Sequence, residues 1–123
     1  MGMDVGILKE AGIDYESGVK RFMDDAAFYE SVLELFLEDT VLDRARIARA
    51  AGDRKALFAC AHEMKGASGN ADLAALFHAS EALVELLRND RGGDDEIESA
   101  YQEFERAYIA AKEGIRQAKA AGK

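Results

Sequence analysis

The chain of 123 residues contains no proline and no tryptophan, and its single cysteine is Cys60. Without a second cysteine, an intramolecular disulfide bond is excluded. No apolar run approaches the roughly 18 consecutive residues that a membrane-spanning helix requires. Residues 1–10 also lack the basic start and apolar core of a signal peptide. We therefore expect a cytoplasmic protein that does not associate with a membrane.

The alternation of apolar and polar residues that is typical of β-strands is missing, whereas apolar residues three and four positions apart recur along the chain. Apolar residues make up 49% of the sequence, which is enough for one self-sufficient core at this length. We predict a single all-α domain over residues 1–123, an up-down antiparallel four-helix bundle with short N-terminal helices. Residues 1–13 form an N-terminal segment in this prediction, and residues 116–123 form a frayed tail.

Capping residues and glycines set the boundaries of the expected helices. The expected helices cover residues 5–11, 15–23, 25–51 with a bend near Thr40, 54–70, 73–89 and 96–119. The third of them has an apolar stripe of Phe28, Val32, Leu35 and Phe36, which is widened by Tyr29, Leu33 and Leu37. So wide a stripe predicts that this helix lies in the bundle core.

Acidic residues outnumber basic ones by 24 to 16, which gives a net charge of -8. Because no basic face accumulates, we expect no binding to nucleic acid. Cys60, His62 and His78 do not have the spacing of zinc ligands, so we expect no metal site. The glycine loops of ATP-binding enzymes are absent as well, and we do not expect self-phosphorylation from ATP.

The segment A-H-E-M-K-G-A-S, from Ala61 to Ser68, places a histidine on the outside of an expected helix. We set the centre of the buried stripe at Leu57 and advance about 100° per residue. Five residues then lie within about 60° of the centre and are predicted to be buried: Leu57, Cys60, Ala61, Met64 and Ser68. His62 lies about 140° from the centre, so its imidazole is predicted to face solvent.

Two glycines and two lysines surround this histidine. An interior helical glycine costs about 1 kcal/mol relative to alanine, and we find no packing reason in the sequence for Gly66 or Gly69. Gly66 lies one turn after His62 and leaves room for a phosphoryl group. The flexible Lys65 side chain can reach a phosphate as a point charge, and Lys55 lies on the same exposed side. The pattern favours a phosphate-carrying histidine, although an ordinary surface histidine remains the alternative.

The segment resembles the A-H-x-L-K-G-x-S motif of histidine-containing phosphotransfer (HPt) domains, the carriers of multistep two-component phosphorelays. Five residues occupy the motif positions: His62, Met64, Lys65, Gly66 and Ser68. The stretches at residues 12–25, 28–36 and 51–53 resemble the family's usual entry and first long helix, so the resemblance covers nearly the whole chain. One departure is Asp72, because the family often has glycine about ten residues after the histidine.

The resemblance implies a carrier rather than an enzyme. His62 would accept a phosphoryl group from the aspartate of a receiver domain, in a response regulator or a hybrid histidine kinase, and pass it to another receiver. The receiver would supply Mg²⁺, and the carrier itself, as a monomer, would need no cofactor. Lys65, Gly66, Gly69 and Lys55 would contact the phosphate or the partner. We expect Phe58, one turn before His62, to anchor the docked receiver.

Other functions remain open from the sequence alone. A helical adaptor bundle would bind a partner helix without carrying phosphate, and it would tolerate replacement of His62. A histidine kinase dimerisation domain would form a symmetric four-helix dimer, whereas this chain has enough helices for a bundle by itself. A phosphohistidine phosphatase is a third possibility. A monomer in solution would favour the carrier, and a tight dimer would favour the kinase domain.

Overall fold

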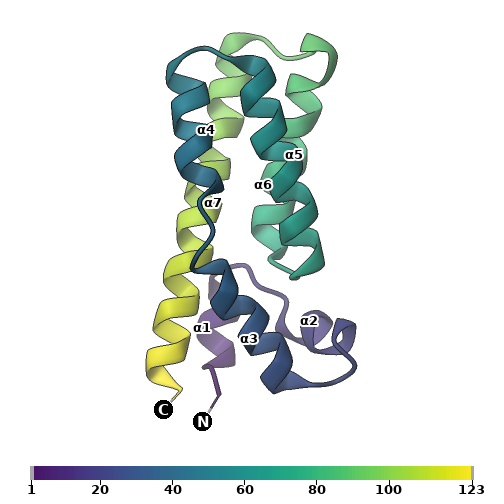
Figure 1. Ribbon diagram of the computed structural model, residues 1–123, viewed down its shortest axis with the longest axis vertical. Helices are drawn as coiled ribbons and strands as arrows, with labels where there is room; N and C mark the ends of the chain where they lie inside the picture. The colour runs from purple at the N-terminus through teal and green to yellow at the C-terminus, as the bar shows by residue number, and fades with distance from the viewer. Residues whose placement is uncertain (1, 123) are drawn as a thin grey trace.

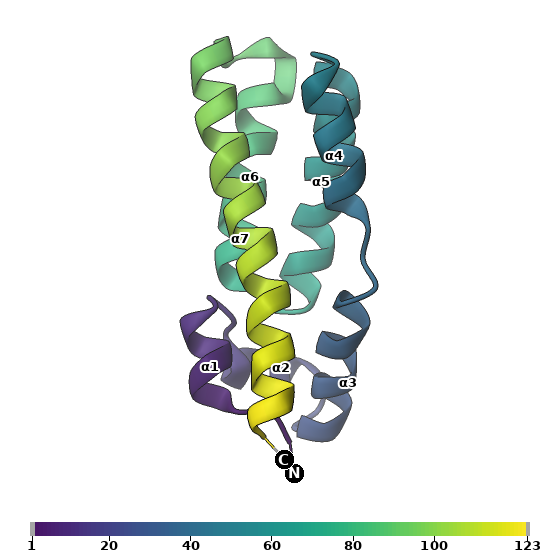
Figure 2. The ribbon, with the colours of Figure 1, turned by 90° about the vertical axis from the view of Figure 1, so that its left-hand side faces the viewer.

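The computed structural model describes residues 2–122, in which every regular element is helical. The elements are α1 (Val5–Glu10), α2 (Tyr15–Arg21), α3 (Ala26–Phe36), α4 (Val41–Ala50), α5 (Arg54–Asn70), α6 (Ala74–Leu87), the 3-10 turn η1 (Arg88–Asp90) and α7 (Asp94–Ala121). Helices α4, α5, α6 and the N-terminal half of α7 form an antiparallel bundle (Figures 1 and 2). Helices α1 and α3 lie beside the C-terminal half of α7, and α2 lies next to α3 beneath the α5–α6 turn (Figure 1). The predicted all-α class and four-helix bundle are confirmed. None of the helices in residues 2–122 has the length and apolarity of a membrane span.

Three aspartates begin helices as the sequence predicts. The side chains of Asp14, Asp25 and Asp53 each accept a hydrogen bond from the backbone N–H three residues further on, at 3.0 to 3.1 Å. Each bond satisfies one of the donors that a helix leaves free at its start. Gly12 and Gly52, with φ of 84° and 67°, follow the ends of α1 and α4 as predicted.

Helix α3 is rotated relative to the sequence prediction. Its buried residues are Tyr29, Leu33 and Phe36, whereas Phe28 and Leu35 are 53% and 70% exposed. The prediction is therefore wrong for Phe28 and Leu35, whereas Phe36 of the stripe and the widening residues Tyr29 and Leu33 are in the core. An apolar stripe this wide does not fix the rotation of a short helix, so the packing against α2 and α7 decides it.

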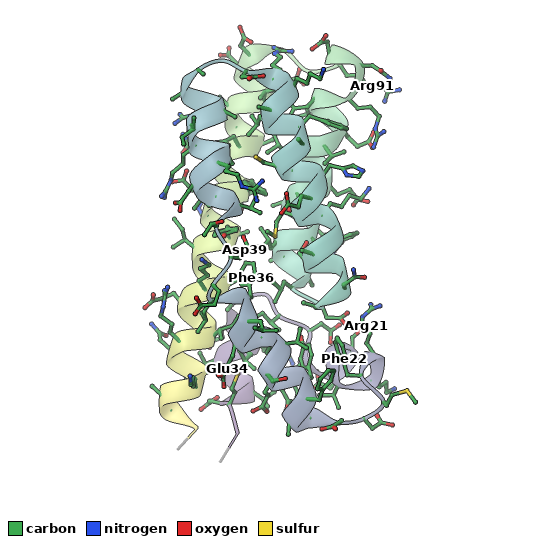
Figure 3. The ribbon with its side chains drawn as sticks, in the orientation of Figure 1. Arg21, Phe22, Glu34, Phe36, Asp39 and Arg91 are labelled. Carbon is green, nitrogen blue, oxygen red and sulfur yellow. The ribbon has the colours of Figure 1, made fainter. Side chains whose placement is uncertain are left out.

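The bend expected near Thr40 is a complete break, so residues 25–51 form two helices and not a continuous one (Figure 3). The Asp39 carboxylate accepts hydrogen bonds from the Val41 N–H at 2.8 Å and the Tyr108 hydroxyl at 2.6 Å. The Lys112 ammonium donates to the Asp39 carbonyl. Two side chains of α7 thus hold the break, and spacing along the sequence gives no signal for them.

Residues 116–121, which belong to the predicted frayed tail, continue helix α7 in the structure. Ile115 and Ala118 are fully buried, and the Ala118 carbonyl accepts a hydrogen bond from the Asp4 N–H at 3.0 Å. The N-terminal segment therefore holds the end of α7 in place, and the two ends of the chain lie side by side (Figure 2). Residue 123 of the predicted tail lies outside the described residues.

Asp72, the departure from the HPt motif, occupies the turn between α5 and α6. Its φ of 55° is in the left-handed region, where glycine is the usual choice and aspartate is tolerated. Its carboxylate accepts hydrogen bonds from the Ser17 hydroxyl at 2.8 Å and the Arg21 guanidinium at 2.7 Å. Its carbonyl accepts one from the Asp14 N–H at 3.0 Å. Asp72 thus makes the glycine-type turn and also binds α2 to it.

Two substitutions separate these roles of Asp72. We expect Asp72→Gly to keep the turn and lose only the side-chain bonds, which lowers the free energy of unfolding by about 1 kcal/mol. Asp72→Ala also places a less tolerant residue at positive φ, so we expect a further loss of about 1 kcal/mol. Urea unfolding measures both values. Equal stability of the two variants would show that backbone conformation contributes nothing here.

Candidate functional site

Helix α5 has the buried face that the sequence predicts. Its buried residues are Leu57, Cys60, Ala61, Met64 and Ser68. The Ser68 hydroxyl donates a hydrogen bond to the Met64 carbonyl at 2.6 Å, so this buried polar group is satisfied within the helix. Burial raises the pKa of the Cys60 thiol, which keeps it neutral among the apolar side chains. The opposite face of α5 is consequently turned to solvent.

His62 lies on that solvent face, as predicted. The residue is exposed, and its imidazole forms no hydrogen bond with any residue from 2 to 122. Its one ring contact within residues 2–122 is with Phe58, one turn earlier, at a centroid distance of 5.7 Å and an interplanar angle of 28°. This is a stacked arrangement. The imidazole therefore rests on a second ring while remaining open to solvent.

The Phe58 ring, half-buried, also contacts the end of α6. The guanidinium carbon of Arg88 lies over the ring, 5.7 Å from its centroid. Both residues line a surface hollow of about 370 Å³, together with Arg54, Lys55, Leu87, Asn89 and Asp90. Arg88 is absent from the sequence-based site, because spacing along α5 gives no signal for a residue on another helix.

The two glycines after His62 have different surroundings. A Cβ atom at Gly66 would have no neighbouring atom within 4 Å, so this position is open space. A Cβ at Gly69 would lie 3.2 Å from the Phe77 ring on α6. The interpretation that packing explains neither glycine is therefore wrong for Gly69, which allows α6 to approach closely. It holds for Gly66, beside the exposed histidine.

The helix of His62 also carries two lysines, Lys55 seven residues before the histidine and Lys65 three residues after it. Within the described chain, neither Lys55 nor Lys65 forms an ion pair. The acidic neighbour Glu63 accepts two hydrogen bonds from Arg44 of α4, at 3.1 and 3.2 Å. These bonds raise the pKa of the Arg44 guanidinium, and they direct the Glu63 carboxylate toward α4. Two cations on the solvent face thus remain available to an anion.

The second histidine, His78, is exposed on α6 and meets the Phe77 ring edge-on at 5.5 Å. Among residues 2–122 it has no ring contact with His62, and no group of three or more metal-ligating side chains could hold an ion. The structure therefore shows an ordinary surface position for His78 and one exposed histidine with open space beside it.

Comparison with protein families matches residues 31–121 to the model of the Hpt domain. Neither the curated proteins nor the solved structures gave a significant match. The matched segment includes most of α3, all of α4–α6 and His62. Residues 1–30 lie outside it, so the likeness of residues 12–25 to the family's entry segment stays a prediction.

Proposed function

This chain belongs to the Hpt domain family, and from that membership we propose that His62 carries a phosphoryl group between receiver domains. Proteins of this family are histidine phosphotransfer carriers of two-component phosphorelays, and they interact with response-regulator receivers. The observation that carries the assignment is the exposed imidazole of His62 with the empty position of Gly66 one turn away. A phosphoryl group and a partner surface both fit there.

In the transfer step, the carrier has to supply only a nucleophilic nitrogen. A neutral imidazole has one unprotonated ring nitrogen, whose lone pair can attack phosphorus. That nitrogen forms the N–P bond as the P–O bond to the aspartyl carboxylate breaks. The carboxylate leaves with the bonding electrons, and the proton on the other ring nitrogen stays on the ring. The reverse of this step, on a second receiver, completes the relay.

Charge neutralisation comes from both partners in this proposal. In-line positioning and neutralisation of the phosphoryl oxygens provide most of the catalysis of such transfers. We propose that Lys65, which forms no ion pair in the described chain, contacts the phosphoryl group on His62; its position three residues after His62 on α5 supports this role. The receiver contributes its acidic pocket and Mg²⁺, so the carrier has no cofactor of its own. It acts as a carrier rather than as an enzyme with its own turnover.

The docking interface must surround His62, because the receiver aspartate has to come within bonding distance of the His62 ring nitrogen. Phe58 and Leu87 form the apolar part of the hollow, whose other lining residues, Lys55 among them, are polar or charged. A ring of charge around an apolar centre is typical of protein interfaces. Gly69 contributes indirectly, through the packing of α6. We propose that the carrier acts in the cytoplasm as a monomer, since α4–α7 already complete a bundle.

The test is transfer from a phosphorylated receiver. The protein is mixed with a ³²P-labelled receiver and Mg²⁺, and the label is then located by peptide mapping. We expect acid-labile, base-stable label in the peptide that contains His62, since phosphohistidine has that stability pattern. Label on an aspartate, or no transfer from any receiver of a representative panel, would contradict the proposal.

Lys65 and Gly66 have separable roles in this proposal. We expect Lys65→Ala to slow transfer roughly tenfold through loss of a charge near the phosphoryl group, with an unchanged fold. Gly66→Gln should block access to His62 while helicity stays equal or rises slightly, because glycine is the poorer helix former. Single-turnover transfer and circular dichroism measure these effects. If Gly66→Gln unfolded the bundle, the glycine would be a packing residue.

A further inference from the structure

We propose that Phe58 is a positioning residue for phosphotransfer, which holds the imidazole of His62 in its reactive orientation, and that Arg88 acts through it. The proposal rests on the function assigned to His62 above. It extends that function from one helix to two, because Arg88 lies on the turn that follows α6.

The stacking leaves the reactive part of the imidazole free. The lone pair of the unprotonated ring nitrogen lies in the plane of the ring, so phosphorus must approach along that plane. Phe58 is stacked on the imidazole at an interplanar angle of 28° and therefore engages its face rather than its edge. The contact can restrict rotation of the ring without occupying the path of the phosphoryl group.

The helix positions one turn before and one turn after His62 carry side chains of very different size. Side chains on a helix point back toward its N-terminus, where the imidazole meets Phe58 one turn earlier. One turn later, Gly66 presents no side chain and has open space around it. The imidazole thus has one supporting surface and one empty side. An exposed side chain without other partners would otherwise exchange among its rotamers.

Arg88 fixes the supporting ring. Its guanidinium lies over Phe58 at 5.7 Å, a cation–π distance, and Glu85 holds the guanidinium through an ion pair at 3.5 Å. The same Glu85 also pairs with Arg91 at 3.9 Å. Arg91 lies in the α6–α7 loop at the end of the molecule (Figure 3). Arg88 contacts the Phe58 ring, whereas Arg91 contacts no aromatic ring in the described part of the chain.

A positioning role differs measurably from a docking role. If Phe58 only anchored the receiver, its loss would raise the receiver concentration needed for half-maximal transfer and leave the maximal rate unchanged. If it orients His62, the maximal rate falls in the complex that has already formed. Misplacement of a reacting group can reduce rates strongly even where binding is intact.

The first measurement is the NMR spectrum of the His62 ring protons in the unphosphorylated protein. A stacked phenyl ring shifts these protons upfield, so Phe58→Leu should move them toward the positions of a free histidine. Phe58→Tyr keeps the ring and should leave them nearly unchanged. A spectrum that is identical in Phe58→Leu would overturn the stacking on which the proposal depends.

The second measurement is single-turnover transfer at increasing receiver concentration. We expect Phe58→Leu to lower the maximal rate roughly tenfold. Phe58→Tyr, which keeps an aromatic ring, should have a maximal rate within about twofold of the wild-type value. Arg88→Gln should lower it roughly threefold. Arg91→Gln removes the same charge near Glu85 and is the matched control, with an unchanged rate.

The thermal unfolding of each variant is measured to check that it is folded. If Phe58→Leu is unstable, Arg88→Gln still tests the proposal, because it changes no core residue. An unchanged maximal rate in folded Phe58→Leu would overturn the positioning role, and equal rates for Arg88→Gln and Arg91→Gln would overturn the role of Arg88. These results are distinct from failure of the phosphotransfer assignment, in which the wild-type protein itself would take no label on His62.

Discussion

Replacing His62 by glutamine is expected to abolish acceptance of a phosphoryl group from any phosphorylated receiver. Glutamine is similar in length and polarity, but its amide nitrogen has no free lone pair for attack on phosphorus. Since His62 is exposed and forms no hydrogen bond with residues 2–122, its loss should leave the fold unchanged. The measurement is radiolabel transfer from receiver to carrier, followed over many turnover times of the wild-type reaction.

A matched control for this experiment is His78→Gln, because His78 is the other histidine of the chain and is also exposed. We expect it to accept label like the wild-type protein. Label that persisted in His62→Gln and disappeared in His78→Gln would move the phosphoacceptor to α6. Loss of label in both variants would indicate that the exposed histidines act together, contrary to the single-site proposal.

The second large effect is a loss of stability on replacing Gly18 by alanine, although alanine has the higher helix propensity. Alanine replacing an interior helical glycine normally gains up to about 1 kcal/mol. At Gly66 the added Cβ meets open space, so we expect Gly66→Ala to show this gain. At Gly18 of α2 the added Cβ would lie 2.0 Å from the Tyr29 ring, so we expect Gly18→Ala to lose about 1–3 kcal/mol.

The Tyr29 ring cannot simply move away from Gly18. It is fully buried, and its hydroxyl donates a hydrogen bond to the Ala71 carbonyl at 2.6 Å in the turn after α5. Displacement would break this bond or push α2 off the core. Chemical denaturation of Gly18→Ala and Gly66→Ala in parallel measures the difference. Equal stabilities would show that α2 adjusts around the methyl group at no cost.

Sequence reasoning succeeded where the information is local. The caps at Asp14 and Asp53 lie within a few residues of the groups they satisfy. The buried face of α5 follows a narrow stripe of small and apolar residues with one possible rotation, and this fixed the outward direction of His62. The position of the candidate site on its helix was therefore predictable from the residue pattern of that helix alone.

The failures depend on partners distant in sequence. Helix α3 carries apolar residues on two faces, so only its neighbours select Tyr29 over Phe28 for the core. The break after α3 depends on Tyr108 of α7, and the reason for Gly69 is Phe77 of the next helix. No periodicity along one helix contains such information. Arg88 was missed for the same reason.

The hydrogen bond between Asp4 and Ala118 joins the segment before α1 to α7 and has a consequence for the order in which the helices can pack during synthesis. The helical hairpins of α4, α5 and α6 form from neighbouring segments and can pack as they emerge. Helix α1 precedes the bundle along the chain, yet its principal packing surface is on α7, which follows the bundle. Helix α1 therefore emerges before α4–α6 but cannot bury its apolar side until α7 has emerged as well.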